Sequence, residues 1–267
     1  MWLPALLYGV IVGFSLGLTG GGGSIFAVPL LVYGLGVPAR DAVTISLAAV
    51  GLTALFGAVQ RWRAGQVEVR TGLMFAVAGM FGAPIGAWLS GLLSDVILLT
   101  LFAVLMLFVA VRMWRKAGEP PRAALVDPDT GPTCRRDPEG VLRLTSRCAM
   151  LLSVVGLGAG VLSGLFGVGG GFVIVPALVM FSGMGIHRAV ATSLMVIALV
   201  SASGFTSHML SGRECSLELV GLFAVGGVGG MYLGQRVAQR ISGPTLQKVF
   251  AVAIIAVAAF IIGKNWM

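Results

Sequence analysis

Charged residues are scarce in this chain. Asp, Glu, Lys and Arg make up only 10% of its 267 residues, whereas hydrophobic residues make up 57%. A soluble domain carries about 25% charged residues, so this composition excludes a large water-exposed surface. The mean hydropathy is +0.99. The composition therefore predicts a membrane protein with no large soluble core.

Long stretches of the chain contain no charged residue at all. A helix needs about 20 apolar residues to cross the hydrocarbon of a bilayer. Two of the stretches, 96–111 and 249–263, are shorter, but flanking Arg, Lys and Trp can reach the interface. The charge-free stretches are 1–39, 42–60, 71–94, 96–111, 148–187, 189–212, 219–235 and 249–263.

Acidic residues are absent from the interior of these stretches. Those outside residues 112–147 lie at the ends of the stretches: Asp41, Glu68, Asp95, Glu214 and Glu218. Buried carboxylates mark cation sites and proton relays in membranes, so their absence argues against a carboxylate-based cation antiporter. The chain also lacks a P-loop, an HExxH motif and a carboxylate cluster. We therefore expect no ATP-driven transport, no enzyme activity, no cofactor and no metal site.

The cysteines and the basic residues carry no sign of a soluble function. Cys134, Cys148 and Cys215 form no CxxC pair and no metal-ligand spacing, and we expect them to be free. The net charge is +8, but most basic residues flank apolar stretches, which favours topology signals over nucleic-acid binding. The N-terminal residues 1–9 lack a basic region and a cleavage site, so they are expected to be membrane sequence rather than a signal peptide.

A glycine-rich phrase that ends in proline occurs twice. Residues 17–29 read GLTGGGGSIFAVP and residues 164–176 read GLFGVGGGFVIVP, an offset of 147 residues. Further matches at this offset include Ser46 with Ser193 and Gly57 with Gly204. The chain is therefore an internal duplication. We expect a first transmembrane repeat at 1–111, a polar linker at 112–147 and a second transmembrane repeat at 148–267.

The basic residues distinguish two arrangements of these repeats. The linker holds eight of the eighteen Lys and Arg residues, which predicts a cytoplasmic location. If the first stretch of each half crosses the membrane once, the repeats are parallel and thirteen basic residues lie inside. If it folds back as two short helices, the repeats are inverted and fifteen lie inside. The second arrangement is favoured. It predicts an all-α fold in which each repeat is a glycine-broken helical hairpin plus three transmembrane helices, with 8–10 membrane segments and both termini outside.

The glycine runs offer a site for an anion. Four consecutive glycines, Gly20 to Gly23, cannot form a stable helix interior, because each costs about 1 kcal/mol relative to Ala. Irregular backbone within a membrane must be buried in protein or line a wet cavity. A helix that starts at such a loop presents N–H groups and a positive dipole end to an anion. Secondary transporters with inverted repeats commonly bind substrate between them near the midplane.

Each of these features has a simpler interpretation. Small residues spaced by four permit close helix crossing, which suits Gly9/Gly13/Gly17, Gly82/Gly86 and Gly230/Gly234. Serine and threonine hydroxyls can bond to their own helix. His208 is the best titratable candidate for a proton carrier, although an interfacial polar role is the simpler one. Hydroxyls follow one another closely in the stretch that precedes it, at Ser201, Ser203, Thr206 and Ser207.

The motif resembles that of the TauE/SafE family of membrane proteins, the sulfite exporter family. The pattern G-x-x-G-x-GGG-x-x-x-V-P is followed by an A-x-x-[ST]-S segment, which the second half matches best, with Ala189, Thr192 and Ser193. In the first half Ser24 replaces a glycine and Ile45 stands where the second half has Thr192. The resemblance covers both halves. It implies transport of sulfite, sulfonates such as sulfoacetate, or organosulfur carboxylates.

We therefore predict a secondary transporter or exporter of small sulfur-containing anions, multi-pass in the inner (cytoplasmic) cell membrane, working by alternating access. An anion channel, or a membrane assembly protein in which the glycines only pack helices, stays open as an alternative. The partners are the anion and the lipid bilayer, with no nucleic acid, and a homo-oligomer is left open. The expected substrate-binding residues are Gly20, Gly21, Gly22, Gly23, Ser24, Thr44, Ser46, Gly167, Gly169, Gly170, Gly171, Thr192, Ser193 and His208.

Overall fold

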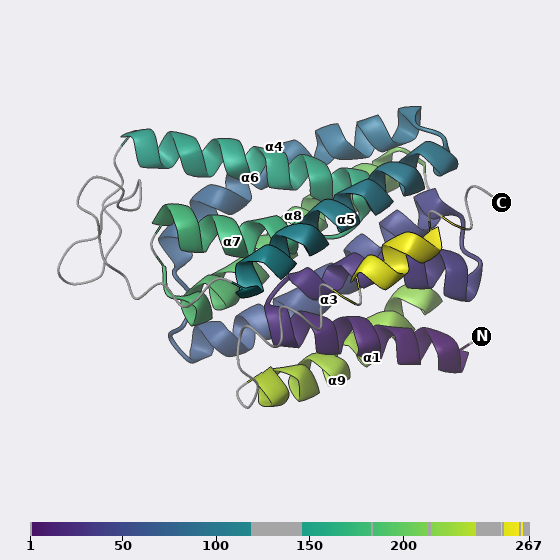
Figure 1. Cartoon of the computed structure of the whole chain (residues 1–267), viewed down its shortest axis with the longest axis horizontal. Helices are drawn as coiled ribbons and strands as arrows, with labels where there is room; N and C mark the ends of the chain where they lie inside the picture. Colours follow the sequence, from purple (N-terminus) through teal and green to yellow (C-terminus); the bar gives the residue numbers. More distant parts are fainter. Residues whose placement is uncertain are drawn as a thin grey trace.

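The structure is a computed structural model that describes residues 2–118, 146–182, 184–212, 215–238, 252, 254–261 and 263. All regular structure in these residues is helical, which confirms the predicted all-α class. Residues 119–145, most of the predicted linker, lie outside the described residues. The helices run along the long axis of the molecule (Figure 1).

The first half contains five helical segments. They are α1 (Trp2–Thr19), a broken segment made of η1 (Gly22–Phe26), α2 (Ala27–Pro29) and η2 (Leu30–Gly34), α3 (Ala39–Arg63), α4 (Val69–Leu92) and α5 (Asp95–Gly118). The second half repeats this order with α6 (Ser146–Phe166), α7 (Gly171–Ser182), α8 (Ile186–Leu210), α9 (Leu217–Ala238) and a helical segment within 254–261.

Within the described residues, six helices are long and apolar enough to span a bilayer, namely α1, α3, α4, α6, α8 and α9. Two shorter apolar helices lie at Gly22–Gly34 and Asp95–Val111. Large apolar side chains such as Phe81, Trp88 and Phe108 are exposed on the outer faces, where lipid would cover them. The membrane class that the composition predicts is confirmed.

The helix breaks at each glycine phrase as predicted, but the first helix of each pair is not short: α1 has 18 residues and α6 has 21, which is long enough to span a bilayer. Gly20 ends α1 with φ 72°, which glycine adopts without strain. The chain then returns along α1, because a Cβ at Gly23 would lie 2.2 Å from the Ser15 backbone and one at Gly34 would lie 2.5 Å from the Tyr8 ring. Gly167 ends α6 in the same way with φ 71°. These two places are the helix breaks that the glycines predict.

Other glycines join helices of opposite halves. Helix α1 packs against α9, and α6 packs against α4 (Figure 1). A Cβ at Gly13 would lie 1.9 Å from the Gly227 carbonyl oxygen, and one at Gly160 would lie 2.1 Å from that of Gly79. Such contacts confirm that small residues permit close crossing here. The same interfaces hold Gly9, Gly17, Gly82, Gly86, Gly230 and Gly234.

The two long helices α3 and α8 pack against each other in opposite directions. Gly51 approaches Ser201, whereas Leu47, one turn earlier in α3, approaches Gly204, which lies later in α8. The chain position thus rises along one helix as it falls along the other. These helices correspond to each other in the sequence duplication, and each supports the glycine loop of the other half. The loops therefore lie at the crossing of the two halves.

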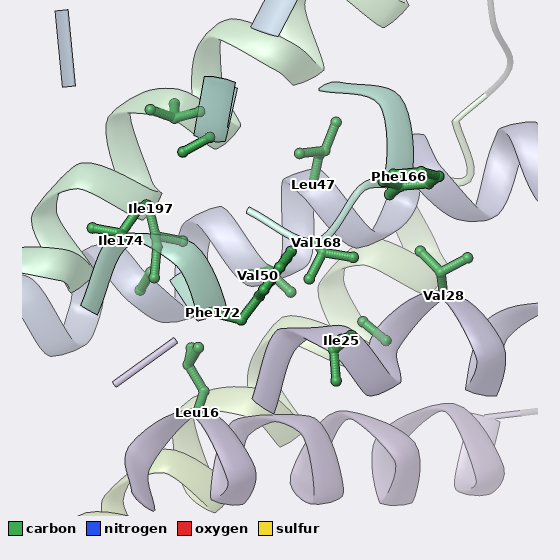
Figure 2. Packing of buried hydrophobic residues seen from close by; sticks show 14 of the residues in the cluster. Leu16, Ile25, Val28, Leu47, Val50, Phe166, Val168, Phe172, Ile174 and Ile197 are labelled. Atoms are coloured by element: carbon green, nitrogen blue, oxygen red, sulfur yellow. The ribbon is translucent and has the colours of Figure 1, made fainter. Parts of the chain in front are cut away.

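Apolar side chains enclose this crossing. Figure 2 shows Val50 of α3 beside Val168 and Phe172 of the second half, with Ile25 of the first half close by. Val168 and Ile25 are 0% exposed. The glycine loops are thus sealed in the protein interior, as irregular backbone in a membrane must be.

One expectation about the cysteines is wrong. Cys215 is free, but Cys148, at the start of α6, is disulfide-bonded. Sequence spacing does not reveal disulfide pairing, because it depends on how the folded chain places the sulfur atoms.

Candidate functional site

The two glycine loops meet in direct backbone contact. A Cβ at Gly171 would lie 2.5 Å from the Gly21 Cα, and one at Gly21 would lie 2.7 Å from the Gly171 Cα. The Ser24 hydroxyl donates to the Gly21 carbonyl at 2.8 Å and also contacts the Val168 carbonyl of the other loop. Only glycine permits so close an approach of two backbones. The loops thus form one buried centre made from both halves.

One serine ties each loop to the opposite half. The Ser46 hydroxyl of α3 donates to the Gly167 carbonyl at 2.7 Å, and the Ser193 hydroxyl of α8 donates to the Gly20 carbonyl at 2.6 Å. The two bonds are equivalent under the offset of 147 residues. Both hydroxyls are fully buried and are directed at carbonyl oxygens in this conformation.

The other predicted side chains, Thr44, Thr192 and His208, form their hydrogen bonds outside the loops. Thr44 donates to the Arg40 carbonyl of its own helix at 3.3 Å. Thr192 accepts the Glu68 N–H at 3.0 Å, at the start of α4. His208 is buried, and its Nε2–H donates to the Gly164 carbonyl at 2.8 Å, just before the second loop. The structure thus brings Ser24, Ser46 and Ser193 together with the glycines, but directs these other three elsewhere.

Three hydroxyl residues near the loops were not selected from the sequence. Thr19 accepts the Gly23 N–H at 3.1 Å and so caps the first loop. Ser201 of α8 is 0% exposed, and its hydroxyl has no hydrogen-bond partner among the described residues. The Ser163 hydroxyl, in the last turns of α6, is also buried and has no hydrogen-bond partner among the described residues. An unsatisfied buried hydroxyl costs about 1–3 kcal/mol, so such groups often have a functional reason.

The site carries no buried ionised side chain. Within the described part of the chain the buried polar side chains are serines, threonines and His208. The same residues contain no cluster of His, Cys, Asp and Glu that could hold a metal ion. Helix α7 starts at Gly171, so its N-terminal dipole points into the second loop. Neutral donors and a positive dipole end suit an anion better than a cation.

A separate open cavity lies at one end of the helices. It has a volume of about 620 Å³ and is lined by the N-terminal end of α3, the C-terminal ends of α4 and α8, and Trp88. Arg40 enters it, but its Nε pairs with Asp95 at 3.2 Å and its Nη2 donates to the Leu93 carbonyl at 2.6 Å. The cavity is a candidate vestibule at the helix ends, away from the glycine loops.

The fold and this centre define a multi-pass membrane protein with a buried, uncharged polar site between two related halves. The chain matches the family model described as sulfite exporter TauE/SafE over residues 5–261. A "Probable membrane transporter protein" of Xylella fastidiosa (strain Temecula1) is 36% identical over 264 residues, covering 97% of this chain and 94% of that protein.

More distant relatives agree. The "Probable membrane transporter protein YunE" of Bacillus subtilis is 27% identical, and a protein with the same general name from Haemophilus influenzae is 29% identical, each over 96% of both chains. No solved structure matches the chain. The chain belongs to the TauE/SafE family. The family and relatives support membrane transport, and none of these names is that of an enzyme.

Proposed function

We propose that this protein is a secondary transporter that exports a small sulfur-containing anion: sulfite, a sulfonate such as sulfoacetate, or an organosulfur carboxylate. The observation that carries the proposal is the backbone contact between Gly21 and Gly171. It places two glycine loops, with hydroxyl donors and a helix N-terminus, in a buried centre without ionised side chains. The family description names sulfite, and the other sulfur-containing anions are those that the motif's resemblance implies.

Substrate binding at this centre can draw a serine hydroxyl away from its loop carbonyl. Ser46 and Ser193 now donate to loop carbonyls of the opposite half. A hydroxyl rotates at little cost, so its hydrogen can pass from a carbonyl to an anion oxygen that enters the loop. The same step breaks a bond between the two halves. Anion binding would therefore loosen the contact across which one repeat rocks against the other.

An inverted orientation of the repeats is part of this proposal. The antiparallel packing of α3 and α8, which correspond to each other in the duplication, supports it. The charge distribution supports it too, with fifteen of the eighteen basic residues on the linker side. In this arrangement the linker is cytoplasmic, both termini lie outside, and the membrane is the inner cell membrane. Two inverted halves give the alternation between inward-open and outward-open states that such carriers use.

The direct test is radiolabelled sulfite and sulfoacetate transport in proteoliposomes. A carrier should accumulate labelled anion transiently against excess unlabelled anion inside, whereas a channel should show flux without this counterflow. Protein-free liposomes provide the baseline. If intact protein moves neither anion nor any organosulfur carboxylate above that baseline, the proposal is wrong.

The packing alternative requires a glycine whose replacement the fold tolerates. A Cβ at Gly169 would lie 2.9 Å from Ile197 at φ 67°, so Gly169→Ala would strain the fold whatever its function. A Cβ at Gly22 would lie no closer than 3.3 Å from any of its neighbours, so Gly22→Ala is the milder change. If the loops serve transport, Gly22→Ala should lower flux while the protein stays folded. If the glycines only pack helices, Gly22→Ala should change neither flux nor stability, because its Cβ would meet no neighbour closer than 3.3 Å.

A further inference from the structure

The two glycine loops differ in how their polar groups are satisfied. In the first loop the Gly23 N–H donates to the Thr19 hydroxyl at 3.1 Å. The Ser24 hydroxyl donates to the Gly21 carbonyl at 2.8 Å and contacts that of Val168. The side chains of the first half thus bond part of its own loop, in which the Gly21 and Gly22 N–H groups form no backbone bond within the described residues.

The second loop lacks both of these closing side chains. At the offset of 147 residues, Phe166 stands in place of Thr19 and Gly171 in place of Ser24. Backbone bonds within the described residues use the N–H groups of Gly167, Val173 and Ile174, but none is formed by those of Gly169 and Gly170. Helix α7 then begins at Gly171, where the first N–H groups have no partner within the helix.

A buried hydroxyl lies beside this open loop. A Cβ at Gly169 would lie 3.2 Å from the Ser201 Oγ. The Ser201 side chain is 0% exposed, and its oxygen has no hydrogen-bond partner in the part of the chain that the structure describes. The equivalent residue of the first half is Ala54. The unused donor therefore belongs to the second half alone.

We propose that the anion binds at the second loop only, and that Ser201 is one of its ligands. The Ser201 hydroxyl and the N–H groups of Gly169 and Gly170 donate to the oxyanion, and the α7 dipole stabilises its charge. The chain then holds one anion, off the symmetric centre, despite its duplicated motif. The proposal rests on the proposed function, because it assigns the donor set of the same transport site.

The test compares Ser201→Ala with Ser203→Ala. Ser203 lies on the same helix, but its hydroxyl already donates to the Met80 carbonyl at 2.8 Å. Ser201→Ala removes a hydroxyl that has no partner, so the purified variant without anion should melt at or above the wild-type temperature. Its affinity for sulfite, measured by calorimetry, should fall about tenfold or more, as expected for a lost hydrogen bond to a charged group.

Ser203→Ala should retain the sulfite affinity within about twofold, and wild-type protein should bind one sulfite per chain. Wild-type affinity and flux in Ser201→Ala, or two anions per chain, would overturn the inference while leaving the proposed function in place. A Ser201→Ala protein that melts at a lower temperature without anion would also overturn it, because the hydroxyl would then be structural. If the wild-type protein neither binds nor transports sulfite, sulfoacetate or an organosulfur carboxylate, the proposed function falls and the inference falls with it.

Discussion

Single hydroxyls decide how the centre of this protein is held together. Along α8, Ser203 donates to the Met80 carbonyl, whereas Thr206 and Ser207 donate to carbonyls of their own helix. Ser201, on the same helix, has no such partner among the described residues. These four hydroxyls thus bond in three different ways, and only that of Ser201 is buried with its hydrogen free to donate.

The cap of the first loop gives a prediction at this scale. Thr19→Val removes the acceptor for the Gly23 N–H but keeps the shape of the side chain. The variant should lose about 1 kcal/mol of unfolding free energy, the usual value of a cap, and melt at a lower temperature in detergent. Its sulfite affinity should not change, because the proposed anion site is at the other loop.

Thr100→Val is the matched control, since the Thr100 hydroxyl is exposed and bonds only to the Val96 carbonyl of its own helix. It should melt near the wild-type temperature. A large loss of sulfite affinity in Thr19→Val would show that the first loop also binds the anion.

Sequence reasoning found the loops but could not rank their side chains. The helix breaks follow from consecutive glycines, which no stable helix tolerates. Whether a serine faces a carbonyl or an empty position depends on the neighbouring helix, as for Ser46 and Gly167, which are 121 residues apart. The role of Thr19 depends on a short turn that brings the Gly23 N–H to it, and that of Ser201 depends on the residues of other helices around it. The sequence therefore predicts where the loops of the candidate site lie, but not which side chains complete it.

In the packed helix pairs, glycine sets the distance between the two helices. Helices α1 and α9 approach so closely that their backbones touch at Gly9, Gly13 and Gly17. Because the two helices belong to different halves, this packing joins the halves as well as the helices. The spacing of four residues predicts a packing face, but it does not reveal that the partner is the last long helix of the other half.

Gly13→Ala tests this interface against Gly229→Ala. A Cβ at Gly13 would lie 1.9 Å from the Gly227 carbonyl oxygen, whereas one at Gly229 meets nothing within 4 Å. Gly13→Ala should force the helices apart and cost about 1–3 kcal/mol of unfolding free energy. Gly229→Ala should be neutral or stabilising by up to about 1 kcal/mol, because alanine favours the helix. Equal melting temperatures for the two variants would contradict the packing described.

For the whole molecule, the contacts repeat when the halves are exchanged. Ser46 bonds Gly167 as Ser193 bonds Gly20, and α1 packs on α9 as α6 packs on α4. The duplication in the sequence predicts related halves. That a serine of each half bonds the glycine loop of the other half could not be predicted, because these contacts join residues far apart in the chain.

Cys215 reports on the orientation of the whole molecule. It lies between α8 and α9, at the end that the proposed topology places outside. In a variant that keeps only this cysteine, a membrane-impermeant maleimide added to intact cells should label it. Burial raises the pKa of Cys215, and Asp41 raises this pKa further.

Since the thiolate reacts, labelling of Cys215 should be slow near neutrality. Its rate should level off at a higher pH than that of an exposed thiol, whose pKa is about 8.5. A control with Ala64→Cys as its only cysteine, in the exposed turn after α3, should react only after the cells are opened. Labelling of Ala64→Cys in intact cells, with Cys215 labelled only after the cells are opened, would show that the topology is the opposite of the one proposed.

The most direct test of the central claim is a structure determined with selenite, the selenium analogue of sulfite, using the anomalous signal of selenium to locate the anion. We predict one anion per chain, with oxygens about 3 Å from the Ser201 hydroxyl and from the N–H groups of Gly169 and Gly170. An anion found only in the cavity beside Arg40, or no anion at either glycine loop, would contradict the account.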